Sequence, residues 1–413
     1  MIVPEPHALP DLVQELHRQA APWLPAGQGT RLHWGPPVQP GAGQEHPTVV
    51  STARLDRIVE HCVGDFTVTV QAGVPLQQLQ QELAARGQWL ALDWPWGSGA
   101  DGSESGTVGG LVARGLAGGL RQRYLGVRDQ LIGLSLLRAD GTAAKAGGRV
   151  VKNVAGYDLM RLFTGSWGSL GLITELTLRT LPRPRLRRGL LLQGPLPALE
   201  RLRRQALASP LMPELIEWWR PAGSAAASGA SAPEAQPALL IGLASISAEA
   251  IAEQLGSWRM SAEAAGLQAE SLDPEALISL RADTPGPRAS AGEERWLLRL
   301  GLLPAQLSEL LADTPLLQGL GYSLAAGSGL GMAWGSAAAV PAYRVEALRR
   351  RCKELGGERG GESGGTLTLL EQPSGAQLPA WESSPARPLI EAVKREFDPL
   401  QQLARGRLPG VQA

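Results

Sequence analysis

The sequence predicts an α+β protein with two domains and a closing segment. Its 413 residues are enough for two or three domains with a sizeable core. Strand-like apolar runs alternate with helical patterns along most of the chain. The run LPRPRLRR, residues 181–188, interrupts this alternation, and the composition changes after it. We therefore expect a first domain at 1–185, a second at 186–375 and a closing segment at 376–413.

The first domain is expected to place short strands and helices between glycine-rich connections. Helical patterns occupy Asp11 to Gln19 and the stretch VPLQQLQQELAARG, which ends at Gly87 because glycine readily adopts the left-handed conformation of a helix C-terminus. Strand patterns lie at 21–24, 131–137 and 172–178. The stretch TVVSTARLDRIVEHC, residues 48–62, predicts a strand, a turn and the start of a helix.

Two rounds of strand and helix patterns predict one sheet in the second domain, with helices on a single face. The first round contains GLLLQG, the helix PALERLRRQAL and ELIEWW, and the second contains RWLLRLGLL, AQLSELLAD and GYSLAAGSGLGMAWG. Such βαβ-like rounds are typical of ferredoxin-like units. The low-complexity run at 221–238 predicts a flexible loop within this domain. A final helix is expected from Ala386 to Phe397.

The charge balance and the hydropathy pattern exclude some classes of partner. Lysine plus arginine and aspartate plus glutamate each number 39, so no net field draws the chain to nucleic acid or to an anionic membrane. The N-terminus MIVPEPHALP lacks the basic start of a signal peptide, and no apolar run approaches the length of a membrane span. These features predict a cytoplasmic protein, with peripheral association at the inner face of a membrane open only through a partner.

Cysteine and histidine are too sparse to predict a metal site. Cys62 and Cys352 lie far apart, which argues against a disulfide framework and fits a reducing compartment. Two thiolates do not make the full ligand set of an iron–sulfur cluster. The last of the five histidines is His61, and no pair of them has a spacing that places two ligands on one helix face.

Glycine gathers in four segments of the first domain. They are PAGQGTRLHWG at 25–35, GTVGGLVARGLAGG at 106–119, RYLGVRD at 123–129 and VVKNVAGYDLMRLFTGSWGSLG at 150–171. Glycine contributes no packing, so each segment serves either as a tight turn or as a place where the backbone approaches a ligand closely. In the first segment, the backbone amides of residues 27–30 could form a nest for a phosphate oxygen. None of the segments has the spacing of a P-loop or of the dinucleotide-binding fingerprint.

The order of these segments resembles the FAD-binding domain of the vanillyl-alcohol oxidase family, also called the p-cresol methylhydroxylase (PCMH) type. PAGQGT matches that family's diphosphate-binding loop, GTVGG its ring-contacting loop, and GSWGSLGLITELTL its glycine-rich strand along the ribityl and adenosine part of the cofactor. The resemblance covers about residues 10–185 and the tail FDPLQQLARGRLP. It implies a PCMH-type FAD-binding domain of two subdomains, an α+β cap domain, and a closing segment that packs back on the FAD domain.

The resemblance narrows within the family to the FAD-binding E-subunit type of bacterial glycolate oxidase. It is carried by GLAGGLRQRYLGVRDQLIG and by GGRVVKNVAGYDLMRLFTGSW, in which KNVAGYDL is the most distinctive piece. It implies a multi-subunit complex with a homologous catalytic flavin subunit and an iron–sulfur subunit. The implied substrate is a small 2-hydroxy acid, glycolate, which is oxidised to glyoxylate, and D-lactate stays open.

The resemblance also assigns cofactor contacts residue by residue. They are Pro25, Gly27, Gln28, Gly29 and Thr30 from the first loop, Gly106, Thr107, Gly109 and Gly110 from the second, and Tyr157, Asp158, Gly165, Gly168, Gly171 and Ile173 from the last. Lys152 and Asn153 are further candidates for contact with phosphate or substrate. For Asp158 an equal alternative is a role at the N-terminus of a helix, where a carboxylate favours the positive end of the dipole.

Two departures from the family bear on the mechanism. Some members attach FAD through a histidine in the first glycine loop, but this loop reads AGQGTR, so non-covalent FAD is expected and His33, beyond the loop, is interpreted as a surface residue. Catalytic relatives carry histidines around a GDGN-like motif, whereas the matching AAGSGLGMAW at 325–334 has none. No residue is therefore assigned as the base for the substrate hydroxyl, and Tyr322, Tyr343 or a carboxylate stays open.

Three functions follow from these observations. The first is an FAD-binding subunit that assists a partner catalytic flavin subunit in a glycolate oxidase complex. The second is a stand-alone FAD-dependent dehydrogenase of glycolate or D-lactate, which needs a base that the sequence does not reveal. The third is a structural paralogue without turnover, whose flavin is a spectator or a relay.

Overall fold

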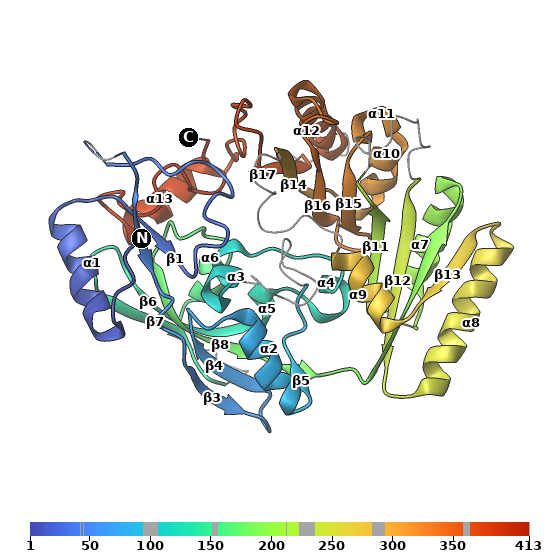
Figure 1. The fold of residues 1–413 in the computed structure, drawn as a ribbon, viewed down its shortest axis with the longest axis horizontal. Helices are drawn as coiled ribbons and strands as arrows, with labels where there is room; N and C mark the ends of the chain where they lie inside the picture. The colour runs from blue at the N-terminus through green and yellow to red at the C-terminus, as the bar shows by residue number, and fades with distance from the viewer. Residues whose placement is uncertain are drawn as a thin grey trace. The chain divides into compact units, whose positions relative to one another are not determined.

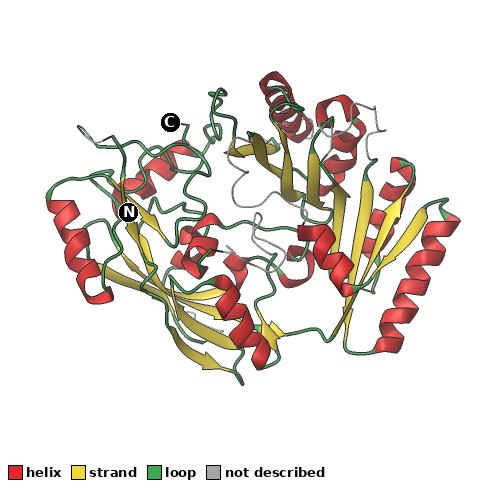
Figure 2. Cartoon of the chain, in the orientation of Figure 1, coloured by secondary structure: helices red, strands yellow, loops and turns green. Residues whose placement is uncertain are grey.

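Two compact units make up the chain (Figure 1). The computed structural model describes residues 1–41, 43, 45–93, 106–150, 156–211, 213–222, 236–282, 294–357 and 364–412. Unit 1 contains Met1–Leu116, Leu125–Arg183 and Pro379–Ala413, and unit 2 contains Ala117–Tyr124 and Pro184–Leu378. Most of the low-complexity run, 223–235, lies outside the described residues. The predicted α+β class is confirmed, since both units mix helices with sheets (Figure 2).

Unit 1 is built around a five-stranded antiparallel sheet in the order β3-β4-β8-β6-β7. Its strands are β3 (Ile58–Cys62), β4 (Thr67–Gln71), β6 (Leu131–Leu137), β7 (Ala143–Gly147) and β8 (Leu172–Arg179). Two small sheets accompany it: the parallel pair β1 (Trp23–Ala26) and β2 (Thr48–Ser51), and the antiparallel pair β5 (Gln88–Trp89) and β9 (Leu181–Pro182). The strands predicted at 131–137 and 172–178 are therefore confirmed.

The helix start predicted within residues 48–62 is wrong, because residues 58–62 form strand β3. This strand pairs antiparallel with β4, from Ile58 opposite Val70 to Cys62 opposite Thr67. Ile58 and Val59 are β-branched and favour extended backbone, and the open edge of β4 supplies the hydrogen bonds. The alternative as a helix would leave that edge of the sheet unpaired.

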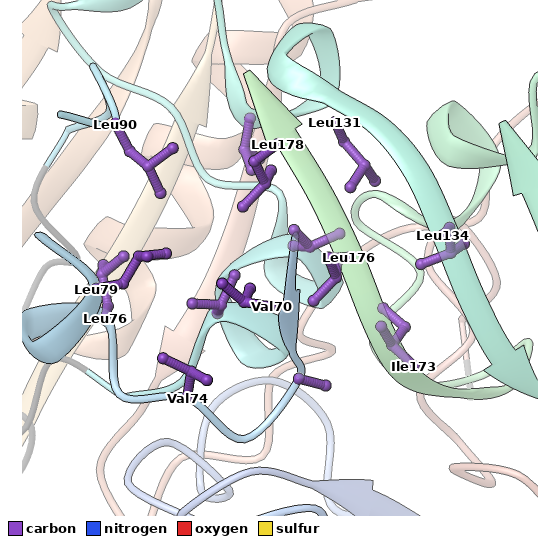
Figure 3. Close-up of a cluster of buried hydrophobic side chains, with 14 of the residues drawn as sticks. Val70, Val74, Leu76, Leu79, Leu90, Leu131, Leu134, Ile173, Leu176 and Leu178 are labelled. Atoms are coloured by element: carbon purple, nitrogen blue, oxygen red, sulfur yellow. The ribbon is translucent and has the colours of Figure 1, made fainter. Parts of the chain in front are cut away.

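The helices of unit 1 pack their apolar residues against the five-stranded sheet. They are α1 (Leu9–Arg18), α2 (Leu76–Ala85), α3 (Val108–Arg114), α5 (Val127–Gln130), α6 (Leu159–Phe163) and α13 (Arg387–Phe397), with a 3₁₀ turn at Pro6–Ala8. Figure 3 shows Leu76 and Leu79 of α2 in one cluster with Val70 of β4 and Leu176 of β8. All four are at most 1% exposed. Each such side chain contributes about 1.5–3 kcal/mol by its burial.

Unit 2 contains a single eight-stranded antiparallel sheet in the order β13-β10-β12-β11-β15-β16-β14-β17. Its strands are β10 (Leu186–Gln193), β11 (Leu215–Arg220), β12 (Ala238–Ser245), β13 (Gln268–Leu272), β14 (Arg295–Gly301), β15 (Gly321–Ala325), β16 (Leu330–Ser336) and β17 (Thr366–Glu371). Its helices are α4 (Arg121–Tyr124), α7 (Leu196–Ala208), α8 (Ala248–Ala264), α9 (Pro274–Ala282), α10 (Leu307–Ala312), α11 (Thr314–Leu317) and α12 (Ala342–Gly357), with a 3₁₀ turn at Pro304–Gln306.

The eight strands divide into two ferredoxin-like repeats. The first runs β10-α7-β11-β12-α8-β13, and its strands lie in the spatial order fourth, first, third, second. The second runs β14-α10-α11-β15-β16-α12-β17 with the same relative order, and the repeats join where β11 pairs with β15. Helix α9 departs from the predicted single helical face, because it lies on the face opposite α7 and α8 (Figure 1). Its Arg281 pairs there with the buried Glu217.

Residues 117–124, which the sequence places in the first domain, group with unit 2, where they contact two buried carboxylates on and next to strand β11. Glu217 Oε1 accepts a hydrogen bond of 3.1 Å from the Gly119 amide and lies 3.0 Å from Arg281. Glu214 accepts a hydrogen bond of 3.1 Å from the Tyr124 hydroxyl. Burial of Tyr124 raises its pKa, and the negative charge of Glu214 adds to that effect. Both glutamates are 1% exposed, so they depend on these donors and cations for satisfaction.

The C-terminal segment is part of unit 1, and a buried ion pair fixes it there. Lys394 of α13 donates to Asp398 at 2.5 Å, to the Ser169 carbonyl at 2.7 Å and to the Leu403 carbonyl at 2.9 Å. Asp398 is fully buried and also accepts the amides of Gln402 and Leu403. Burial lowers the pKa of Lys394, and the charge of Asp398 opposes that shift.

Replacing Asp398 by asparagine should therefore destabilise unit 1 strongly. The variant keeps the shape of the side chain but leaves the Lys394 ammonium buried without its counter-charge, so the free energy of unfolding should fall by about 3–5 kcal/mol. Urea denaturation measures the change. Arg387→Gln is the matched control on the same helix, because it breaks an exposed pair with Glu391 and should cost less than about 1 kcal/mol. Equal losses of unfolding free energy in the two variants would contradict the role of the Lys394–Asp398 pair in fixing the C-terminal segment.

Candidate functional site

A cavity in unit 1 collects the first two glycine loops and part of the last one. It is lined by residues of β1 and the loop after it, of the turn into α3, of α3 itself, and of the loop that leads into β8. Its volume is about 120 Å³. Segments separated by more than a hundred residues thus meet around one space.

The first glycine loop is positioned by the parallel pair of strands. Strand β1 ends at Ala26, whose carbonyl accepts a 2.8 Å hydrogen bond from the Thr52 amide at the end of β2. The Ser51 hydroxyl donates to the Gly27 carbonyl at 2.7 Å. Gly29 follows with φ +81°, a conformation that favours glycine. The loop therefore turns where β2 anchors it.

The other two segments are tied to each other through α3. Thr107 precedes this helix, and its hydroxyl accepts the Gly110 amide at 3.2 Å, which is the usual N-cap bond. At the other end of the helix, the Trp167 amide donates to the Ala113 carbonyl at 2.9 Å and the Gly165 amide donates to the Val112 carbonyl at 3.0 Å. The loop at 165–171 therefore follows the C-terminal end of α3.

Most of the cofactor contacts predicted from the sequence lie around this cavity. The lining includes Pro25, Gly27, Gln28, Gly29, Thr30, Gly106, Thr107, Gly109, Gly110, Gly168, Gly171 and Ile173. Tyr157, Asp158 and Gly165 are not among the lining residues. Tyr157 is 89% exposed, and Asp158 accepts the Arg161 amide at 3.3 Å, as its alternative role at a helix N-terminus predicts. Lys152 and Asn153 lie outside the described residues.

Several of the lining glycines are required by contacts within the protein itself. A Cβ added to Gly27 would lie 2.2 Å from Thr107 Oγ1, and one added to Gly109 would lie 2.7 Å from Ala72 Cβ. A Cβ on Gly171 would lie 3.0 Å from the Leu137 carbonyl oxygen. Gly168 has φ +74°, which any other residue would adopt only with strain. The sequence offered two reasons for these glycines, tight turns and close approach to a ligand. The structure adds a third reason, which is close packing against neighbouring segments of the protein.

Three arginines that the sequence did not single out also line the cavity. They are Arg31 after the first loop, Arg114 at the end of α3, and Arg407 in the C-terminal tail. Burial lowers the pKa of Arg114 well below its ordinary value, and the charges of Arg407 and Arg31 add to that effect. Burial lowers the pKa of Arg407 to about 10. Asp93 is the one acidic residue in the described lining, so the cavity is basic and suits an anion.

The sequence carried only a weak signal for these arginines. Arg114 ends the otherwise apolar run GGLVAR between two glycines, which could have marked it as a helix-terminal cation. Arg407 stands far from the glycine loops in the chain, and only the folding of the tail brings it to them.

The described residues do not assemble a metal centre or a histidine base in unit 2. No group of three or more histidine, cysteine, aspartate or glutamate side chains that could hold a metal ion occurs in the part of the chain that the structure describes. Cys352 is buried, which raises its pKa to about 12. Of the two candidate tyrosines, Tyr322 is fully buried under the guanidinium of Arg220, and Tyr343 on α12 is 68% exposed. The first loop contains no histidine, and His33 beyond it is exposed.

Comparison with known proteins identifies the cofactor of unit 1. Residues 3–147 match a family model described as an FAD binding domain. These residues form an FAD-binding domain. The prediction of a PCMH-type FAD-binding domain, with FAD as its cofactor, is thereby confirmed for these residues. The cavity fits this cofactor, because a diphosphate is an anion and the lining offers three guanidinium groups together with an unsatisfied buried nitrogen of Arg114.

The FAD-binding domain has curated relatives among enzymes of 2-hydroxy acids. Glycolate oxidase subunit GlcE of Escherichia coli is 37% identical over 39% of this chain and 41% of its own length. Glycolate oxidase subunit GlcD of Bacillus subtilis is 34% identical over 41% of this chain and 34% of its own length. A D-lactate dehydrogenase of Archaeoglobus fulgidus is 33% identical over 45% of this chain and 38% of its own length. The aligned region thus spans less than half the length of each of these relatives.

The fold extends beyond the matched domain. A solved structure of alkyldihydroxyacetonephosphate synthase aligns with 98% of this chain and 77% of its own, with a TM-score of 0.70 and 15% sequence identity. At this identity the likeness establishes the fold alone. None of the helices in the described part of the chain has the length and the apolar composition of a membrane span.

Two adjacent glycines of α3 differ in the space around them, because Gly109 is closely packed and Gly110 is not. Gly109→Ala should lower the free energy of unfolding by about 1–3 kcal/mol, because the new methyl group meets Ala72 in a closed core. Gly110→Ala should change it by less than about 1 kcal/mol, because the nearest atom, Thr107 Oγ1, is 3.3 Å away and alanine favours a helix. Urea denaturation of both variants measures the difference, and a Gly110→Ala loss as large as that of Gly109→Ala would contradict this packing.

Proposed function

We propose that this chain is the FAD-binding subunit of a multi-subunit oxidoreductase that oxidises glycolate to glyoxylate. The observation that carries the proposal is an FAD-binding domain related to two glycolate oxidase subunits, in a chain with no histidine after His61. D-lactate is the second candidate substrate, because D-lactate dehydrogenases are among the relatives of the same domain.

The residues of the cavity bind and orient the cofactor in this proposal. The first loop and the turn before α3 supply backbone amides, and the three arginines supply positive charge. The absence of histidine from the first loop supports non-covalent FAD. Bound FAD supplies a two-electron acceptor for the oxidation of an alcohol carbon. Tyr157, Asp158 and Gly165 are not lining residues here, but they stay within the proposed contacts of a loaded cofactor.

The proton of the substrate hydroxyl needs a base near neutral pKa, and this chain offers no histidine for it in unit 2. Tyr322 is enclosed and Tyr343 faces solvent, so neither is supported as that base. We therefore assign the base to a homologous flavin subunit of the same complex. Electrons would leave through an iron–sulfur subunit, because the two cysteines of this chain cannot supply the four thiolate ligands that a cluster normally takes. Any membrane association would run through these partners.

Purification of the chain alone and with its partners tests this function. Alone, the chain should hold FAD with a yellow flavin spectrum, released by denaturation without a covalent adduct, and should not reduce a dye with glycolate. Together with the homologous flavin subunit it should co-purify and reduce the dye.

Each alternative function has its own outcome in this experiment. Glycolate-dependent dye reduction by the chain alone would identify a stand-alone dehydrogenase. A stable complex in which this chain carries no flavin, or carries flavin that substrate does not reduce, would identify a structural paralogue. Faster dye reduction with D-lactate than with glycolate would change the proposed substrate and leave the proposed subunit role intact.

A further inference from the structure

The guanidinium groups of Arg114 and Arg407 lie in the FAD cavity without carboxylate partners among the described residues. Arg407 Nε donates to the Pro36 carbonyl and its Nη2 to the Leu32 carbonyl, both at 2.6 Å. Arg114 Nη2 donates to the Arg31 carbonyl at 2.6 Å. Carbonyl groups satisfy these donors but do not neutralise their charge. The positive charge of Arg407 lowers the pKa of Arg114, so the two guanidinium groups lie close enough to affect each other.

One nitrogen of Arg114 has no partner at all within the described part of the chain. Its Nη1 is buried and makes no hydrogen bond. An unsatisfied buried donor on a charged group is costly and uncommon in a native protein, and each such case needs an explanation. The geometry is that of an incomplete site, because an acceptor that enters the cavity lined by Arg114 would satisfy this nitrogen, and an anionic acceptor would also offset the charge of the guanidinium.

Trp167 holds the Arg114 guanidinium in place. The guanidinium carbon lies 4.0 Å from the centre of the indole ring, a distance typical of cation–π stacking. The ring is 6% exposed and packs edge to face with Trp381 at 5.4 Å. Trp167 also adopts φ +56°, which is unusual for a bulky residue and costs about 1–3 kcal/mol. Packing on both sides sustains this conformation, so the direction of the Arg114 fork is fixed before a ligand binds.

The predicted phosphate nest lies at the same cavity. Arg31 Nη1 donates to Thr30 Oγ1 at 3.1 Å, and a Cβ on Gly106 would lie 3.1 Å from that same nitrogen. The first glycine loop, the turn into α3 and the arginines thus meet in one region. Among the parts of FAD, only the diphosphate carries negative charge, so it is the part that matches this lining.

We propose that Arg114 and Arg407 bind the diphosphate of FAD, with Trp167 as the positioning residue for Arg114. This proposal rests on the FAD-binding role of unit 1 and goes beyond the glycine loops, which the sequence had assigned to the diphosphate. It explains why these two arginines line a cavity without an acidic side chain as a partner among the described residues. It also implies that the flavin-free protein carries uncompensated charge, which any bound organic diphosphate relieves.

Melting temperatures of the flavin-free full chain test the proposal with three separate ligands. ADP carries the diphosphate without the flavin ring, riboflavin carries the ring without the diphosphate, and glycolate carries a single carboxylate. ADP should raise the melting temperature of the wild type in a salt-dependent way, whereas riboflavin and glycolate should have little effect at the same concentration. Stabilisation by glycolate in place of ADP would overturn the proposal and assign the arginines to the substrate.

Arg114→Met is the decisive variant. It should weaken ADP and FAD binding roughly 10- to 100-fold, the usual loss for a hydrogen bond to a charged group, and should flatten the salt dependence of binding, both measured by calorimetry. Methionine keeps contact with the Trp167 ring and removes a buried charge, so the flavin-free variant should melt at or above the wild-type temperature. Lower affinity without lower stability cannot be ascribed to misfolding.

The controls distinguish this inference from the proposed function. Arg86→Met removes an exposed arginine at the end of α2 in the same unit and should bind ADP as the wild type does. Arg114→Lys keeps the charge but loses the planar fork, so its affinity should lie between wild type and Arg114→Met. If Arg114→Met binds ADP and FAD as tightly as the wild type, the inference fails while the FAD role stands. If the wild type binds no FAD, the proposed function fails.

Discussion

The buried pair of Lys394 and Asp398 is the interaction on which unit 1 depends. Lys394 joins the tail to the last glycine loop through the Ser169 carbonyl, and Asp398 orders the turn by accepting the amides of Gln402 and Leu403. The Gln402 side chain then donates to the Leu16 and Ala21 carbonyls beside β1. An unpaired charge at either position would be expensive in this closed environment, so the tail, the N-terminal helix and the loop form one cooperative body.

This arrangement delivers Arg407 to the cavity. The tail continues from Leu403 along β1, where the Ala404 amide donates to the Trp23 carbonyl, and Arg407 then reaches the carbonyls of Leu32 and Pro36. The cavity of unit 1 is therefore lined by residues from distant parts of the chain, from Leu24 to Arg407. Such a site forms only once the whole unit has folded, which links binding of the cofactor to the stability of the unit.

Unit 2 is organised by one sheet and by ion pairs of buried carboxylates. Two ferredoxin-like repeats form one continuous sheet. The buried carboxylates of Glu217 on β11 and of Glu214 just before it bind residues 117–124 through Gly119 and Tyr124. The same two carboxylates form ion pairs within the unit, Glu214 with Arg187 and Glu217 with Arg281. Ion pairs of this kind stabilise a specific arrangement, because each buried carboxylate keeps its charge partner.

The sequence by itself determined the α+β class, the central strands β6 and β8, the glycine loops and their order, because these depend on local propensity and on the spacing of glycines along the chain. It did not determine strand β3, since only the edge of β4 selects a strand over a helix for residues 58–62. Nor did it determine that Arg31, Arg114 and Arg407 line one cavity. It also did not determine that Thr107 and Ala72 occupy the space that a Cβ atom on Gly27 or Gly109 would need. These features join residues that are distant in sequence, and only tertiary packing brings such residues within contact distance.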